Sequence, residues 1–168
     1  QLTGTLETDM KRFDLMSQVN ARGTYLCSRA CLPHLLQSDL AQVLTISPPL
    51  NMQPHWFKHH VAYTYAKYGM SIMTLGMAAE FSGRVAFNSL WPKTAIATAA
   101  IAFAVGDASM LSKCRKPEIM ADAAALVLQG GKANSGQFLI DEEVLRAAGV
   151  EDFASYRMDP SASEADLV

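Results

Sequence analysis

Residues 61–81, VAYTYAKYGMSIMTLGMAAEF, lie between two short apolar stretches with the composition of buried strands, AQVLTIS (41–47) and RVAFNSLW (84–91). The middle stretch is too long for a typical strand, and its surface is rich in Met, Leu and Ala, so it predicts a long helix. A strand, a long helix and a second strand in this order favour a parallel α/β arrangement.

The remaining elements extend the same pattern on both sides. Helices are predicted before the first strand and after the second, and a third short strand, QFLID, is predicted at 137–141. Pro33 is expected to break or kink the helix that contains it, and Gly69 and Gly76 leave room for another helix to approach closely. The predicted helices are residues 5–20, 21–37, 94–105, 116–129 and 142–150, with a loop at 48–60. The last dozen residues are expected to be loose.

Composition limits the classes of protein to which the chain can belong. It has 168 residues, of which 50% are hydrophobic and 18% charged, as expected for one soluble globular domain. A net charge of −2 does not favour binding to nucleic acid or to an anionic membrane. The most apolar run, residues 95–105, is too short to cross a bilayer, which takes about 20 residues.

Cysteine and histidine do not point to a metal site. The three cysteines have no paired spacing, which argues against a disulfide framework and for a reducing compartment. One helical face combines two cysteines with a histidine, but cysteines in a protein core are far commoner than such ligand sets. The loop histidines have no carboxylate or cysteine close in sequence. These residues are Cys27, Cys31 and His34 on the helix, Cys114, and His55, His59 and His60 in the loop.

Tyr63 and Lys67 are the first candidate site residues, because they lie four apart and therefore share one helical face. This spacing alone is a weak signal, and a buried tyrosine beside a solvated lysine is the simpler interpretation. The order of neighbouring features favours the other interpretation, in which the pair has a catalytic role. Asn20 precedes a strand that ends in Ser47, and Pro92 follows the next strand.

Four blocks occur in the order found in the short-chain dehydrogenase/reductase family, which the chain resembles over residues 5–141. They are VNARGTYL (19–26), VLTIS (43–47), YTYAK (63–67) and NSLWPKTAIAT (88–98). The resemblance implies the C-terminal part of a Rossmann-type doubly wound parallel sheet, with about three strands and flanking helices. No glycine-rich phosphate turn follows a strand in this sequence, so the N-terminal dinucleotide-binding half is expected to be missing. The predicted organisation is this partial domain at residues 1–150, followed by a polar tail at 151–168.

The resemblance also implies roles for the residues in these blocks. Tyr63 is the general acid/base, and Lys67 binds the nicotinamide ribose and lowers the phenol pKa. An ammonium about 4 Å away contributes roughly 4 kcal/mol at an effective dielectric near 20, enough to lower that pKa by up to about 3 units. Asn20 holds a water against Lys67, although an asparagine that kinks or caps a helix is the alternative. Ser47 polarises the substrate carbonyl.

The serine block departs from the family pattern. The family has two small residues after this strand, and here the second position is Pro48, which offers no hydroxyl and no N–H. Three outcomes remain open: Ser47 does the work, Asn51 or Thr64 replaces it, or the carbonyl partner is lost. A serine at a strand end can also simply bond the backbone.

The cofactor turn departs as well. The family has Pro-Gly here, whereas this chain has Pro92 followed by Lys93. The resemblance places the backbone from Thr94 to Ile96 against the nicotinamide carboxamide, with Thr94 or Thr98 near a phosphate. Lys93 either adds charge near the pyrophosphate or is exposed to solvent. The cofactor is NAD or NADP, with a slight preference for NADP.

The predicted function is that of a fragment of an NAD(P)-dependent oxidoreductase that interconverts a carbonyl and an alcohol by hydride transfer. The fragment alone is expected to be inactive. The alternative is a non-catalytic cofactor-binding or oligomerisation protein of the same ancestry, which Pro48 and Lys93 suggest.

The predicted partners are a small apolar carbonyl or alcohol substrate, covered by a flap at 95–111, and further copies of the chain. The resemblance suggests a homo-oligomer through the helices at 21–37 and 61–81. A cytoplasmic location is expected, or a peroxisomal or mitochondrial one in a eukaryote, although the ending SASEADLV has no peroxisomal tripeptide.

Overall fold

The computed structural model describes residues 2–105 and 108–167, without the side chains of 103–109. By its internal contacts the chain forms two compact units. The first unit consists of Gln1–Leu90 and Gly130–Leu139, and the second of Trp91–Gln129 and Ile140–Val168.

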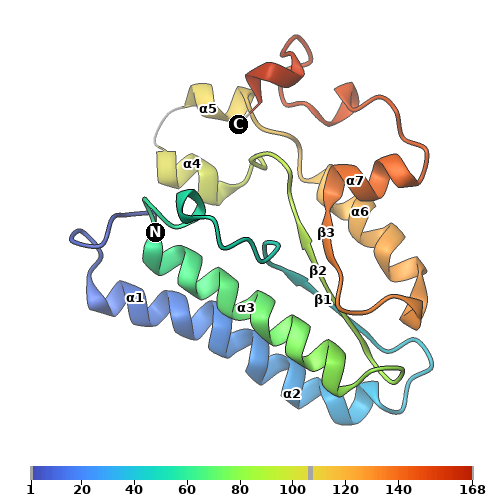
Figure 1. Ribbon diagram of the computed structural model, residues 1–168. Coiled ribbons are helices and arrows are strands. Elements are labelled where there is room, and N and C mark those ends of the chain that lie inside the picture. The colour runs from blue at the N-terminus through green and yellow to red at the C-terminus, as the bar shows by residue number, and fades with distance from the viewer. Residues whose placement is uncertain (1, 106–107, 168) are drawn as a thin grey trace. The chain divides into compact units, whose positions relative to one another are not determined.

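Three parallel strands with flanking helices make the α/β fold that the sequence predicts (Figure 1). The strands are β1 (Gln42–Ile46), β2 (Ala86–Trp91) and β3 (Phe138–Ile140), in the order β1-β2-β3. In the parallel pairing of β1 with β2, Gln42 lies opposite Ala86 and Ile46 lies opposite Leu90. The strand β1 therefore forms one edge of the described sheet, and β2 lies in its centre.

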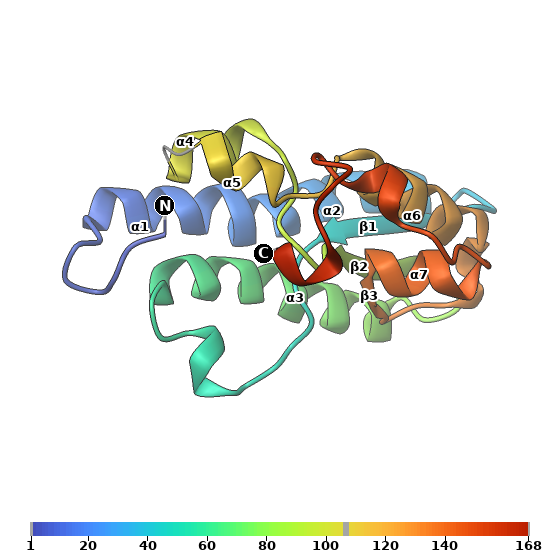
Figure 2. The ribbon, with the colours of Figure 1, turned by 90° about the horizontal axis from the view of Figure 1, so that it is seen from above.

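The helices of the first unit are α1 (Met10–Ser17), a π-helical turn at Gln18–Arg22, α2 (Gly23–Leu35) and, after a 3-10 turn at Pro54–Trp56, α3 (Val61–Glu80). In this unit, α1 and α2 follow each other end to end, and α3 runs beside them (Figures 1 and 2). The helix α2 continues through Pro33 to Leu35, so a break there is wrong, while the alternative of a kink stays a prediction. The helix is irregular at the π turn instead. There the Asn20 side-chain amide donates a hydrogen bond to the Met16 carbonyl, and this bond competes with the regular backbone bonds of the helix.

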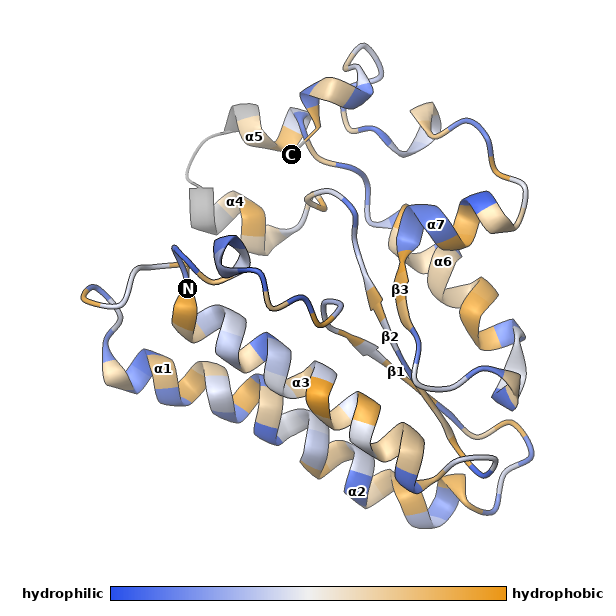
Figure 3. Cartoon of the chain, in the orientation of Figure 1, coloured by the Kyte–Doolittle hydropathy of each residue, from blue (hydrophilic) through white to orange (hydrophobic). Residues whose placement is uncertain are grey.

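The core of the first unit lies between α2, α3 and the sheet. Its buried members lie just before β1, near the end of α3, just before β2 and in β2, and are Ala41, Met77, Ala78, Val85 and Phe87. Partly buried side chains surround them, namely Leu32, Leu35, Val43, Met73 and Phe81. Hydrophobic residues also remain on the exposed surface of the three helices, interspersed with polar ones (Figure 3).

The second unit contains short helices and the C-terminal segment. Its helices are α4 (Ala99–Val105), α5 (Ala108–Ser112), α6 (Glu118–Gln129) and α7 (Asp141–Ala147), with 3-10 turns at Ala154–Tyr156 and Glu164–Asp166. The helix expected from residue 94 begins only at Ala99, because Ala95 and Ala97 pair with the Arg115 backbone. The expected loose end instead bonds Arg115 and Arg157 through Glu164.

Residues 106 and 107 of the expected flap lie outside the described residues. Within the described part of the chain, no helix combines the length and apolarity needed to cross a membrane.

Gly69 allows α3 to approach the π turn closely. A Cβ built on Gly69 would lie 2.8 Å from the Cβ of Ala21, a distance that real side chains do not reach. The same atom on Gly76 meets nothing within 4 Å. The expectation of close helix contact therefore holds for Gly69 and is wrong for Gly76.

We predict opposite effects of alanine at these two glycines. Gly69→Ala should destabilise the protein by about 1–3 kcal/mol, because α3 and the π turn must separate. Gly76→Ala, at an exposed helical position, should stabilise it by about 0.5–1 kcal/mol. Urea unfolding of both variants measures the difference, and equal effects would contradict the close contact.

Candidate active site

Tyr63 and Lys67 lie one turn apart near the start of α3, and both are half-buried. The Lys67 ammonium donates a hydrogen bond of 3.1 Å to the backbone carbonyl of Ile46, the last residue of β1. This bond brings the ammonium to the carboxyl end of the strand. Ligands of open parallel sheets bind at this edge.

The pKa directions of the pair differ from the expectation. Burial raises the pKa of the Tyr63 phenol and lowers the pKa of the Lys67 ammonium. The predicted lowering of the phenol pKa is therefore wrong for the chain by itself. No described residue forms a hydrogen bond with the Tyr63 hydroxyl, whose ring lies edge-on to His60 with 6.0 Å between centroids. A protonated phenol is the form that donates a proton.

Asn20 lies in the π turn, and its side-chain amide donates a 2.9 Å hydrogen bond to the Met16 carbonyl. The alternative interpretation, an asparagine at a helix irregularity, is thus what the structure shows for the free chain. The same turn packs against α3 through Ala21 and Gly69, close in sequence to Lys67. The water-mediated role of Asn20 stays a prediction.

Ser47 is completely buried immediately after β1. Its hydroxyl has no hydrogen-bond partner among the described residues, so it is not the backbone-bonded serine of the simpler interpretation. The following Pro48 uses its carbonyl to accept a 2.6 Å hydrogen bond from Ser71 of α3. A buried hydroxyl without a partner is costly, which makes this position unusual.

The two proposed replacements for Ser47 are already engaged. The Thr64 hydroxyl donates to the Trp56 carbonyl at 3.1 Å and lies 2.8 Å from His60 Nδ1. The Asn51 side-chain oxygen accepts a bond from the Gln53 backbone N–H at 3.0 Å. Thr64 is also buried, whereas Asn51 is exposed.

A row of three polar side chains on α3, of which the sequence pointed only to Thr64, attaches the loop 48–60 to the helix. Besides Thr64 and Ser71, the Tyr68 hydroxyl donates a 2.7 Å bond to the Asn51 carbonyl. These three residues follow an i, i+4, i+7 pattern, so they occupy one helical face. The signal available in the sequence was the helical spacing of these polar residues in a helix with many apolar residues.

The attached loop has an open, mostly apolar hollow beside the start of α3. Its volume is about 590 Å³, and it is lined by Met52, Pro54, His55, Phe57, Lys58 and Val61. The ring of Phe57 packs on that of Tyr68 at 5.1 Å between centroids, which ties the hollow to the same helix.

Lys67 lies in the first unit, whereas the expected cofactor turn at Pro92–Thr98 belongs to the second unit. Ile96 bridges to Arg115, with bonds of 2.9 Å from the Arg115 N–H to the Ala95 carbonyl and 2.8 Å from the Ala97 N–H to the Arg115 carbonyl. The Thr94 hydroxyl is buried without a hydrogen-bond partner among the described residues. Thr98 is exposed, and its carbonyl accepts the Ala102 N–H at the start of α4.

Lys93, beside Pro92 in the same turn, is held at two points by α7. Its ammonium lies 2.7 Å from Glu142 Oε1, and its backbone N–H donates to Asp141 Oδ1 at 2.9 Å. The side chain is 53% exposed, but its charge is paired with Glu142. Lys93 is therefore partly exposed and also paired with Glu142. Neither sequence interpretation, charge near the pyrophosphate or simple exposure to solvent, included this ion pair.

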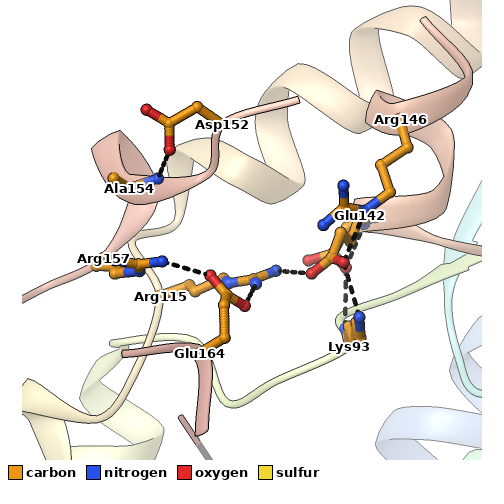
Figure 4. Close-up of polar contacts among 9 residues, drawn as sticks. Lys93, Arg115, Glu142, Arg146, Asp152, Ala154, Arg157 and Glu164 are labelled. Carbon is orange, nitrogen blue, oxygen red and sulfur yellow. Dashed lines mark hydrogen bonds and ion pairs between the residues drawn. The ribbon is translucent and has the colours of Figure 1, made fainter. Parts of the chain in front are cut away.

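Glu142 is the centre of a network of charges (Figure 4). Its carboxylate lies 2.6 Å from the fully buried Arg115 and 2.9 Å from Arg146, in addition to Lys93. Burial by itself raises the Glu142 pKa, but the bonds from these three cations outweigh it and lower the pKa to about 2. For Asp141, burial outweighs the bonds from the backbone N–H groups, so its pKa is raised.

Known proteins share this sequence and fold. A family model described as enoyl-(acyl carrier protein) reductase matches residues 2–131. Human hydroxysteroid dehydrogenase-like protein 2 is 55% identical over 159 residues, which are 95% of this chain and 38% of that protein. The chain therefore spans well under half of the curated relatives it matches.

Solved structures agree with the sequence matches. A protein described as a dehydrogenase from Xanthomonas campestris has a TM-score of 0.90 at 54% identity, and covers 96% of this chain and 60% of its own. A short-chain dehydrogenase from Mycobacterium thermoresistibile has a TM-score of 0.89 at 39% identity, with 99% and 59% covered. More distant structures that share the fold contain NADH or NADP. The chain belongs to the short-chain dehydrogenase/reductase family.

The low pKa of Glu142 predicts a loss of stability in acid. A carboxyl whose folded pKa, about 2, lies below its ordinary 4.5 stabilises the fold fully above pH 4.5 and progressively less below it. Glu142→Gln should thus cost on the order of 3 kcal/mol at pH 7. Urea unfolding should show this cost shrinking as the pH falls from 4.5 toward 2.

The neighbouring exposed Glu143 provides the control. It has no ion pair among the described residues, so Glu143→Gln should have little effect on stability at any pH. A cost of Glu142→Gln that does not change between pH 7 and pH 3 would contradict the role of its charge.

Proposed function

We propose that the protein of which this chain forms part is an NAD(P)-dependent oxidoreductase that interconverts a carbonyl and an alcohol by hydride transfer. The observation that carries this proposal is the Tyr63–Lys67 pair on α3, with the ammonium bonded to the carbonyl at the end of β1. Membership of the short-chain dehydrogenase/reductase family supports it. The chain alone covers too little of its relatives to be expected to turn over substrate.

In this proposal, Tyr63 donates a proton to the substrate oxygen, and the bound nicotinamide supplies the hydride. Burial keeps the phenol protonated, which suits the direction of carbonyl reduction. Lys67 places a positive charge one turn from the phenol, where it stabilises a developing phenolate. Asn20 completes a proton relay through water, and Ser47 polarises the carbonyl.

The turn of the second unit suits the polar edge of a dinucleotide. The Thr94 hydroxyl is buried without a bonding partner among the described residues, and Pro92, Ile96 and Thr98 complete the turn. We propose NAD or NADP as the cofactor, because distant members of the fold contain each of them. We further propose a small apolar substrate, which the apolar hollow beside α3 supports.

The competing proposal is a cofactor-binding protein without turnover. It is favoured by the enclosed Ser47 hydroxyl and by Pro48 in the place of the second small residue. Such a protein would bind NAD(P) but would lack a donor to polarise the carbonyl.

Replacing the Tyr63 hydroxyl distinguishes the two proposals. In the full-length protein, Tyr63→Phe should lower kcat by roughly 100- to 10,000-fold on a carbonyl panel while NAD(P) affinity is retained. Tyr65→Phe is the control, because Tyr65 lies two residues further on α3, is exposed, and stacks on Phe13. Turnover that survives in Tyr63→Phe would remove Tyr63 from the mechanism. Cofactor binding without turnover in the wild type would favour the second proposal.

We also propose that the full-length protein is a homo-oligomer through α2 and α3, in a reducing compartment such as the bacterial cytoplasm. Large apolar side chains are exposed on both helices, namely Tyr25 and Leu26 on α2, and Val61, Ile72 and Leu75 on α3. The exposed cysteines of α2 are free thiols, which suits a reducing environment.

A charge placed on α3 tests the oligomer. Ile72→Arg should lower the sedimentation mass of the full-length protein toward that of a monomer, because the arginine must be desolvated in the interface. Leu40→Arg is the control, since Leu40 is also apolar and exposed but lies outside both helices. An unchanged mass of the Ile72→Arg variant would contradict an interface through this face.

A further inference from the structure

The residue after Pro92 connects the expected cofactor turn to the first turn of α7. Asp141 binds the Lys93 backbone N–H, and Glu142 binds the Lys93 ammonium. A side chain and its own backbone are therefore held by two consecutive carboxylates of one helix. This double attachment restricts both the position and the rotation of the residue.

Arg115 attaches the middle of the same turn. Its backbone pairs with Ala95 and Ala97, while its buried guanidinium lies 2.6 Å from the second oxygen of Glu142. One carboxylate thus joins Lys93 at the start of the turn to Arg115 beside its middle. Glu164 bonds the same guanidinium at 2.6 Å, which brings the C-terminal segment into the network.

We infer that Glu142 is a positioning residue, which holds the turn from Pro92 to Thr98 in the conformation that receives the cofactor by pairing with Lys93 and with Arg115. This inference rests on the proposed function, because the cofactor role of the turn comes from the family. Glu142 acts through the turn and does not touch the cofactor. Lys93 serves as the attachment point of the turn, and its charge is engaged by Glu142 instead of a phosphate.

The network contains its own matched control. Lys93 and Arg146 both bind Glu142 Oε1, at 2.7 and 2.9 Å, and their side chains are 53% and 51% exposed. Lys93→Met and Arg146→Met each remove one half-exposed cation from the same oxygen. Only Lys93 belongs to the turn, so a loss of stability common to both variants can be separated from an effect on the turn.

Hydrogen exchange of the full-length protein without cofactor tests the attachment itself. Lys93→Met should speed amide exchange at residues 93–97 relative to the wild type, whereas Arg146→Met should leave these amides unchanged. Equal exchange of the turn in the two variants would overturn the inference, whether or not the protein is an enzyme.

Cofactor titration then tests the consequence. Lys93→Met should weaken NAD(P) binding by about three- to tenfold, because a looser turn must be ordered on binding. Arg146→Met should bind like the wild type. Equal weakening in both variants would show a general loss of stability and would overturn the inference. A wild type that binds neither NAD nor NADP would instead overturn the proposed function.

A double variant separates positioning from direct contact. If Lys93 acts through Glu142, adding Lys93→Met to Glu142→Gln should weaken cofactor binding no further. An additional loss in the double variant would show that the ammonium meets a cofactor phosphate, which would overturn the positioning role. If Glu142→Gln does not fold, the comparison of Lys93→Met with Arg146→Met decides the question alone.

Discussion

The helical period of α3 is the constraint on which the first unit depends. One face presents Tyr63 and Lys67, and a neighbouring face presents the polar row of Thr64, Tyr68 and Ser71 that holds the loop. Because these sets interleave along a single helix, the loop and the candidate catalytic pair keep a fixed relation to each other. A rotation of α3 would displace both together and would also break the bond from Lys67 to the end of β1.

The second unit depends on a different kind of interaction, a buried carboxylate that serves three cations. Burying one ion pair is costly, since desolvation offsets much of the attraction. Glu142 reduces this cost because Arg115, Arg146 and Lys93 together place positive charge beside both carboxylate oxygens. Its low pKa is the electrostatic consequence, while adjacent Asp141, which has only backbone N–H donors, shifts in the opposite direction.

Much of the fold could be predicted from periodicity and from the order of motifs. The apolar residues of the strands and of the long helix at 61–81 form patterns that local sequence can decide. The helix α3 ends within one residue of the predicted end. The π turn and the late start of α4 could not be predicted. Each depends on the bonds of a single residue. Asn20 bonds the Met16 carbonyl at the π turn, and Arg115 bonds the backbone of residues 95–97 before α4. Such single interactions produce no periodic pattern in the sequence.

The sequence by itself determined the α/β class, the family, and the spacing that places Tyr63 and Lys67 on one helical face. These properties follow from residue order and from the geometry of a single helix. Only the tertiary structure decided that Ser47 is enclosed, that Thr64 is engaged by the loop, and that Lys93 is paired with Glu142. Each of these outcomes depends on which groups from distant parts of the sequence contact the side chain. Tertiary packing, and not the neighbouring residues in the sequence, sets the burial of a side chain and its bonding partners.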